Sequence, residues 1–121
     1  MVRILKYSYQ FRTVTVTQFR KVLIIDLPEE IELVATFLNS DVQNDGHWFL
    51  DAIDKVLSGQ ADYQEFGGNV CIIKVTPKMT KVIDSLADDG IGNYCEIETE
   101  ELKELILIWL KEQAIFKLQH G

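Results

Sequence analysis

Hydrophobic residues recur at helical spacing along the C-terminal stretch from Cys95 to Leu118. The stripe consists of Leu102, Leu105, Ile106, Trp109 and Leu110. Thr99 is placed to cap a helix, because its hydroxyl can accept a bond from an amide of the first turn, where Glu100 and Glu101 suit the helix dipole. Since residues 105–110 are apolar all round, the pattern predicts a long final helix that is covered on more than one side.

Alternating and β-branched residues near the N-terminus predict two or three antiparallel strands, at residues 2–10, 13–18 and 21–26. Two helical stripes follow, at residues 28–39 and 45–57. The first opens with a proline, which suits the first helical position, and the second stops at a serine-glycine pair.

Three short apolar segments predict a three-stranded meander, at residues 62–66, 70–76 and 80–86. Residues 87–94 form an acidic, turn-rich loop before the final helix. This order lacks regular βαβ alternation and therefore predicts an α+β fold, with a mostly antiparallel sheet of about five to six strands. We expect helices on one face of the sheet, a long C-terminal helix, and a single domain over residues 1–121.

The composition, 47% hydrophobic and 26% charged over 121 residues, is typical of a globular chain. No apolar run approaches the length of a membrane span and the N-terminus does not resemble a signal peptide, so we expect a cytoplasmic protein without membrane contact. Charge is uneven: residues 1–21 hold five basic and no acidic residues, which leaves −12 for the rest of a chain of net charge −7. Such a field attracts basic partners and disfavours direct binding of nucleic acid.

Residues with catalytic or metal-binding side chains are scattered rather than grouped. His47 fits a surface or capping position, and Cys71 fits a buried strand, where a thiol is unreactive. Residues 67–69 lack the lysine and hydroxyl of a phosphate-binding loop. Asp84, Asp88 and Asp89 do not follow the order of a calcium-binding loop. We therefore expect no catalytic site, no metal and no cofactor.

Acidic residues are concentrated between Asp84 and Glu104, with eight acids and one base, Lys103. A solvated surface and a favourable helix start explain any one of them. As a set, they indicate a docking surface for a cationic partner, because clustered like charges repel one another unless something offsets the cost.

The segments DAIDKVLSGQADYQEFGGNVCIIKV (51–75) and CEIETEELKELILIWL (95–110) resemble small immunity proteins of bacterial contact-dependent growth inhibition systems. The similarity covers residues 48–118. It implies a non-enzymatic cytoplasmic protein that neutralises the C-terminal toxin domain of an effector, commonly a basic nuclease. The expected contact residues are Asp84, Asp88, Asp89, Tyr94, Glu96 and Glu98. Tyr94 and Tyr63 are candidate aromatic anchors.

Two other interpretations remain open at this stage. One is a small enzyme or ligand-binding domain with His47 or Asp51 at the rim of a pocket between the sheet and the last helix. The other is an adaptor whose acidic face binds a basic cellular protein.

Overall fold

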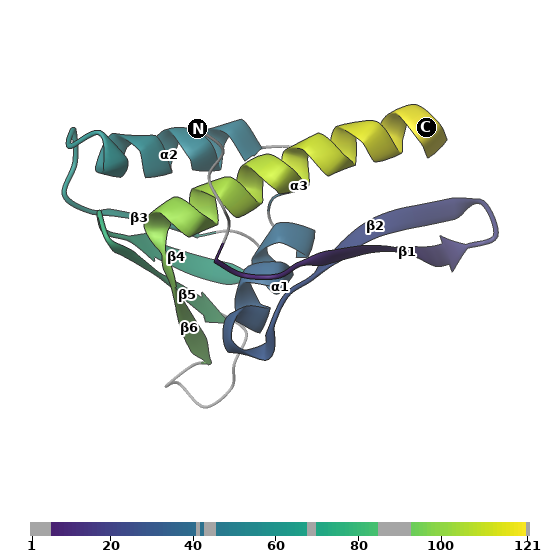
Figure 1. Ribbon diagram of the computed structural model, residues 1–121, viewed down its shortest axis with the longest axis horizontal. Coiled ribbons are helices and arrows are strands. Elements are labelled where there is room, and N and C mark those ends of the chain that lie inside the picture. The colour runs from purple at the N-terminus through teal and green to yellow at the C-terminus, as the bar shows by residue number, and fades with distance from the viewer. Residues whose placement is uncertain (1–5, 41, 43–45, 68–69, 85–92, 121) are drawn as a thin grey trace.

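The long C-terminal helix predicted from the sequence is present and runs along much of the length of the molecule (Figure 1). The computed structural model describes residues 6–40, 42, 46–67, 70–84 and 93–120. The elements, in chain order, are β1 (Gln10–Thr17), β2 (Arg20–Asp26), the 3₁₀ turn η1 (Glu29–Ile31), α1 (Glu32–Ser40), α2 (Gly46–Leu57), β3 (Gln64–Gly67), β4 (Cys71–Val75), β5 (Met79–Asp84), β6 (Tyr94–Glu98) and α3 (Thr99–His120). The α+β fold class is confirmed.

The strands of the described residues form two separate antiparallel sheets. β1 and β2 make a hairpin, and β3, β4, β5 and β6 make a meander in sequence order. The prediction of three strands in the meander was wrong, because residues 94–98 pair with β5 as a fourth strand. The two glutamates of this short segment lower its intrinsic strand propensity. Cross-strand side-chain pairs with β5 stabilise it as a strand nevertheless.

The strand predicted at residues 2–10 was wrong over its described part. Residues 6–9 are irregular, and β1 begins at Gln10. The backbone N–H of Lys6 donates to Glu101 (3.1 Å), and the Tyr7 hydroxyl donates to Glu98 (2.6 Å). These bonds hold residues 6–9 across the junction of β6 and α3. The segment is therefore fixed by hydrogen bonds to glutamate side chains and not by backbone pairing with a strand. Residues 2–5 lie outside the described part.

The meander buries one face. Its inward residues, which α1, α2 and α3 cover, include Phe66, Cys71, Ile73, Val75, Val82 and Ile97. Residues between them point the other way, because successive strand residues alternate between faces. The expected arrangement, helices on one face of the sheet, therefore leaves the opposite face open to solvent.

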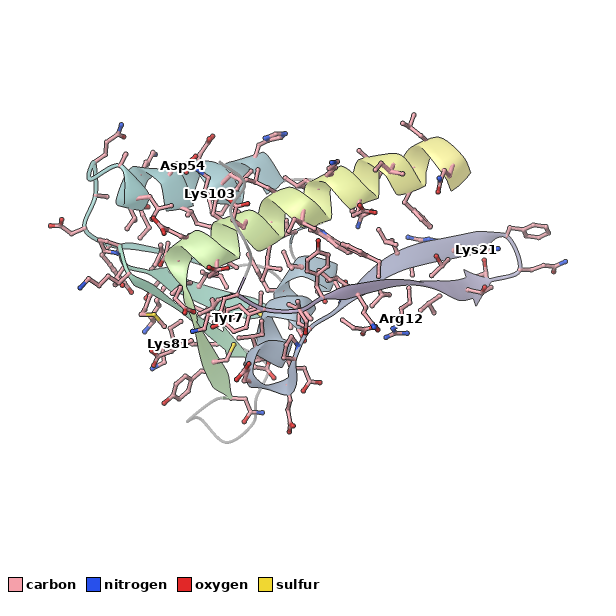
Figure 2. The ribbon with its side chains drawn as sticks, viewed as in Figure 1. Tyr7, Arg12, Lys21, Asp54, Lys81 and Lys103 are labelled. Carbon is pink, nitrogen blue, oxygen red and sulfur yellow. The ribbon has the colours of Figure 1, made fainter. Side chains whose placement is uncertain are left out.

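The N-terminal half of α3 is the centre of the core. Leu102, Leu105, Ile106 and Trp109 are fully buried. α2 packs along one side and is joined to α3 by an ion pair between Asp54 and Lys103 (2.8 Å; Figure 2), while β2 and the meander contact α3 elsewhere. Leu107 nevertheless remains 40% exposed. Neighbouring elements therefore pack on several sides of α3 but leave one side of it in contact with solvent.

The start of α3 is anchored on the turn between β4 and β5. The Thr99 hydroxyl donates to the Thr76 carbonyl (2.6 Å) and shares a buried hydrogen bond with the Thr80 hydroxyl (2.8 Å). The side chain that was expected to cap the helix therefore ties it to the sheet. This anchor fixes the angle at which β6 passes into α3.

Candidate partner-binding site

The open face of the meander carries a row of charged side chains that the strand register brings together. Glu65 pairs with Lys74, Lys74 with Lys81, and Lys81 with Glu96. The Lys74 ammonium lies 3.7 Å from the Glu65 carboxylate. The face is thus acidic at both edges and basic in the middle, a pattern that no contiguous stretch of sequence contains.

Tyr94 and Glu96 lie at the β6 edge of this face, two residues apart on one strand. Both are exposed, Tyr94 by 53%. The Lys81 ammonium lies 4.0 Å from the centre of the Tyr94 ring, a distance at which a cation is attracted to the face of an aromatic ring. Lys81 thereby holds the ring in place while leaving half of its surface available to a partner.

Glu98 lies at the end of the same strand and accepts hydrogen bonds from Lys6 and Tyr7. These two bonds lower the pKa of Glu98 from its ordinary value of 4.5 to about 2. Burial, the hydrogen bond and charge of Glu98, and the nearby charge of Glu30 raise the pKa of Tyr7. Figure 2 shows Tyr7 where the N-terminal segment reaches the β6–α3 junction. Glu98 therefore fastens the N-terminal segment and keeps its negative charge into strong acid.

Asp84 ends β5 and lies at the same end of the sheet as Tyr94. It is half-buried, and its backbone N–H donates to the Asn93 carbonyl (2.8 Å), which continues the β5–β6 pairing beyond the strands. Its place in the alternation puts it with Val82, on the side opposite Tyr94 and Glu96. Asp88 and Asp89 lie outside the described residues.

The β6 edge also gains acids from a distant part of the sequence. η1 contacts β6, and Glu29 and Glu30 on this turn are both exposed. The charge of Glu30 reaches the Lys6 and Tyr7 side chains that bind Glu98. We call Glu29, Glu30, Glu96 and Glu98 the β6 acidic edge. The pair on η1 and the pair on β6 are more than sixty residues apart in the chain. The cluster of acids after Asp84 in the sequence therefore predicted only the pair on β6.

Tyr63, the second candidate anchor, stands at the far edge of the sheet, beside β3. It is 42% exposed, and its hydroxyl donates to Glu65 (2.7 Å). With Tyr94 on β6, the open face has an exposed tyrosine and a carboxylate at each edge. Two strands separate them, so the anchors span the face rather than forming one cluster.

The residues considered for an enzyme lie in different environments. His47 and Asp51 are exposed on α2, Cys71 is buried in β4, and Cys95 is half-buried in β6. Burial raises the pKa of the Cys95 thiol, which favours its unreactive form. Among the described residues no group of three histidine, cysteine, aspartate or glutamate side chains is arranged to hold a metal. None of the helices in the described part is long and apolar enough to cross a membrane.

The chain is similar to a curated protein of Bacillus cereus named "Immunity protein", with 42% identity over 113 residues that make up 93% of each chain. This chain belongs to the immunity proteins. The interpretation of the sequence as an immunity protein is thereby confirmed. No family model and no solved structure matches the chain.

Proposed function

We propose that this immunity protein binds and neutralises the C-terminal toxin domain of a contact-dependent growth inhibition effector, and that the toxin domain is a basic nuclease. The observation that carries the proposal is the identity with a named immunity protein along almost the full length of both chains. The charge of the molecule supports the second part, because −12 over residues 22–121 favours a cationic partner.

The mechanism is occupation of the active site rather than chemistry. A nuclease holds phosphate with cationic side chains, so carboxylates placed over its active site substitute for the phosphates of the substrate and block entry. The proposed contact residues are Tyr94, Glu96 and Glu98 of β6, Asp84 at the same end of the sheet but on its other side, and Asp88 and Asp89, which lie outside the described residues. The exposed half of Tyr94 supplies apolar contact area. Because Lys81 already restricts the Tyr94 ring, less side-chain entropy is lost when a partner binds it.

Nuclease assays with the purified toxin domain of the neighbouring effector gene test the proposal. We expect cleavage to fall with added immunity protein and to stop at one equivalent, while a non-cognate toxin domain keeps its activity. Full nuclease activity at a tenfold excess would reject the proposed function.

Substitution of Tyr94 tests the location of the site. Tyr94→Ala removes an anchor of the size that dominates interfaces, so we expect binding to weaken by about 30-fold or more, equivalent to about 2 kcal/mol. Tyr63→Ala, at the other edge of the same face, is the matched control. If only the control weakens binding, the β3 edge and not the β6 edge contacts the toxin.

A further inference from the structure

The hairpin of β1 and β2 extends away from the meander as a two-stranded arm, which we define as residues 10–26 (Figure 1). Its tip holds the most exposed large hydrophobic side chain of the described residues, Phe19 at 91%. Val16 is 56% exposed, and Figure 2 shows Arg12 and Lys21 along the arm. A two-stranded sheet has two edges with unpaired backbone groups, and both invite a further strand.

Asn39 of α1 occupies one edge of the arm. Its amide oxygen accepts from the Ile25 N–H (3.1 Å), and its amide nitrogen donates to the Ile25 carbonyl (3.2 Å), as a neighbouring strand would do. The backbone groups of Ile25 therefore point away from β1. Phe11 is the partner of Ile25 in this antiparallel pair, so the backbone N–H and C=O of Phe11 point away from β2, toward the free edge of β1. The backbone groups of Thr13 and Thr15 point toward the same edge, because this direction alternates along the strand.

The edge of β1 lacks the usual protection against strand addition. Edge strands are commonly interrupted by lysine, proline or an inward-pointing charge, whereas residues 13–17 read TVTVT and contain none of these. A bulge between Thr15 and Thr17 interrupts the strand only near the tip. An uncharged β-branched edge of this kind readily accepts a strand.

We propose that the β1 edge pairs antiparallel with the β1 edge of a second copy of this chain, giving a two-fold dimer with strand order β2–β1–β1–β2. The register places Val14 opposite Val14 of the second copy. Because Val14 pairs with Val22 within each arm, this register makes a continuous row of four valines on one face. It also separates the two copies of Arg12 by four residues, about 14 Å along the strands.

The ends of the arm are complementary in the same arrangement. Antiparallel pairing about Val14 brings the tip of one arm level with the base of the other, so Phe19 approaches Tyr9 of the second copy, which is 40% exposed.

Cysteine cross-linking tests the register. Val14 and its copy would form a non-hydrogen-bonded pair with Cα atoms about 4.5 Å apart, within the range of a disulfide. We expect Val14→Cys to form a covalent dimer under mild oxidation at least tenfold faster than Val16→Cys. Val16 is the matched control, because it is more exposed but faces Arg12 of the second copy. Equal rates for the two variants, or no cross-linking of either, would overturn the register and the proposal.

Sedimentation of the protein alone tests the interface without cysteine. We expect the wild-type chain to dimerise at sub-millimolar concentration, and Thr13→Pro to be a monomer because proline removes the outward N–H and leaves the β1–β2 ladder intact. Thr13→Val keeps the N–H and should dimerise like the wild type, and circular dichroism confirms that both variants fold. A monomeric wild-type chain overturns the proposal. If the wild-type chain is monomeric and Thr13→Pro also fails to inhibit the toxin domain, the β1 edge binds a strand of the toxin instead of a second copy.

Discussion

At the residue scale, Glu98 has a structural role in addition to its proposed contact with a partner. Its carboxylate is the acceptor that holds both Lys6 and Tyr7, which connects the irregular N-terminal segment to the end of β6. The side chain is 33% exposed, so solvent screens part of this interaction. One residue therefore supports the fold while remaining part of the β6 acidic edge.

Glu98→Gln should lower the free energy of unfolding by about 1–2 kcal/mol at pH 7, since hydrogen bonds to charged groups contribute a little more than this when shielded from water. Because folding lowers the pKa of Glu98 from 4.5 to about 2, the contribution is complete above pH 4.5 and is lost as the pH falls toward 2. Urea unfolding at pH 7 and pH 2.5 should therefore show the difference between wild type and variant shrinking.

Glu96→Gln is the control for that experiment, because Glu96 lies on the same strand and is exposed. We expect it to change stability by less than about 0.5 kcal/mol at either pH. A difference between wild type and Glu98→Gln that stays constant down to pH 2.5 would contradict the assignment.

Gly46 opens α2 at its contact with α3. A Cβ atom at this position would lie 2.4–2.8 Å from three atoms of the Leu110 side chain, closer than carbon atoms pack. Gly46→Ala should therefore destabilise the protein by about 1–3 kcal/mol, the usual effect of overpacking, measured by urea unfolding. Gly67→Ala has open space around it and serves as the control with no loss of stability. Recovery in Gly46→Ala with Leu110→Ala would identify the clash as the cause.

At the element scale, the hairpin is held to the body by its base. Phe11 stacks on Trp109 of α3 (ring centroids 6.2 Å apart), Ile25 is fully buried, and Asn39 bonds both backbone groups of Ile25. The Trp109 indole N–H in turn donates to the Val42 carbonyl, so one side chain of α3 contacts both the arm and the chain that follows α1. Beyond this base the hairpin extends away from the body.

Asn39→Ala should loosen the base of the hairpin. Removing the amide leaves two backbone groups of a buried residue without their partner, at an expected cost of about 1–3 kcal/mol. Hydrogen exchange should accelerate at the Ile25 amide more than at amides of the meander. Asn39→Asp keeps the acceptor for the Ile25 N–H and should protect that amide better than alanine; equal exchange in all three proteins would show that the clamp does not hold the edge.

At the scale of the whole molecule, the separation of charge decides how a partner approaches. The first 21 residues contain five basic and no acidic side chains, and the remaining chain carries a net charge of −12. The fold places much of the basic segment on the arm, away from the β6 acidic edge (Figures 1 and 2). We therefore expect the proposed cationic toxin domain to approach the body of the molecule rather than the arm.

Glu96→Lys should reduce the association rate with the toxin domain and make that rate less sensitive to salt, because it removes an attractive charge from the proposed contact. Glu112→Lys on the C-terminal half of α3 changes the net charge by the same amount and should have a smaller effect. Stopped-flow association at several salt concentrations measures both. Equal slopes for the two variants would indicate that net charge alone, and not the β6 edge, guides the encounter.

The sequence by itself determined the elements that depend on local patterns. The stripe of Leu102, Leu105, Ile106 and Trp109 predicted α3, and the bounds predicted for α2 agree with the structure within one residue. The helix predicted from Pro28 begins later, because the 3₁₀ turn η1 comes first and α1 starts at Glu32. Local pattern failed at residues 94–98 and 6–9. There the conformation depends on partners distant in sequence, namely β5 for the first and Glu98 and Glu101 for the second.

Only the tertiary structure decided which charges meet. Lys81 lies over Tyr94, Lys6 and Tyr7 bind Glu98, and Glu30 joins the same edge, although none of these contacts follows from spacing along the chain. The reason is physical: helix and turn signals report free energies within a few residues, whereas strand register and surface charge are set by long-range packing that no local window contains. The acidic character was therefore readable from the sequence, and the shape in which the acids are presented was not.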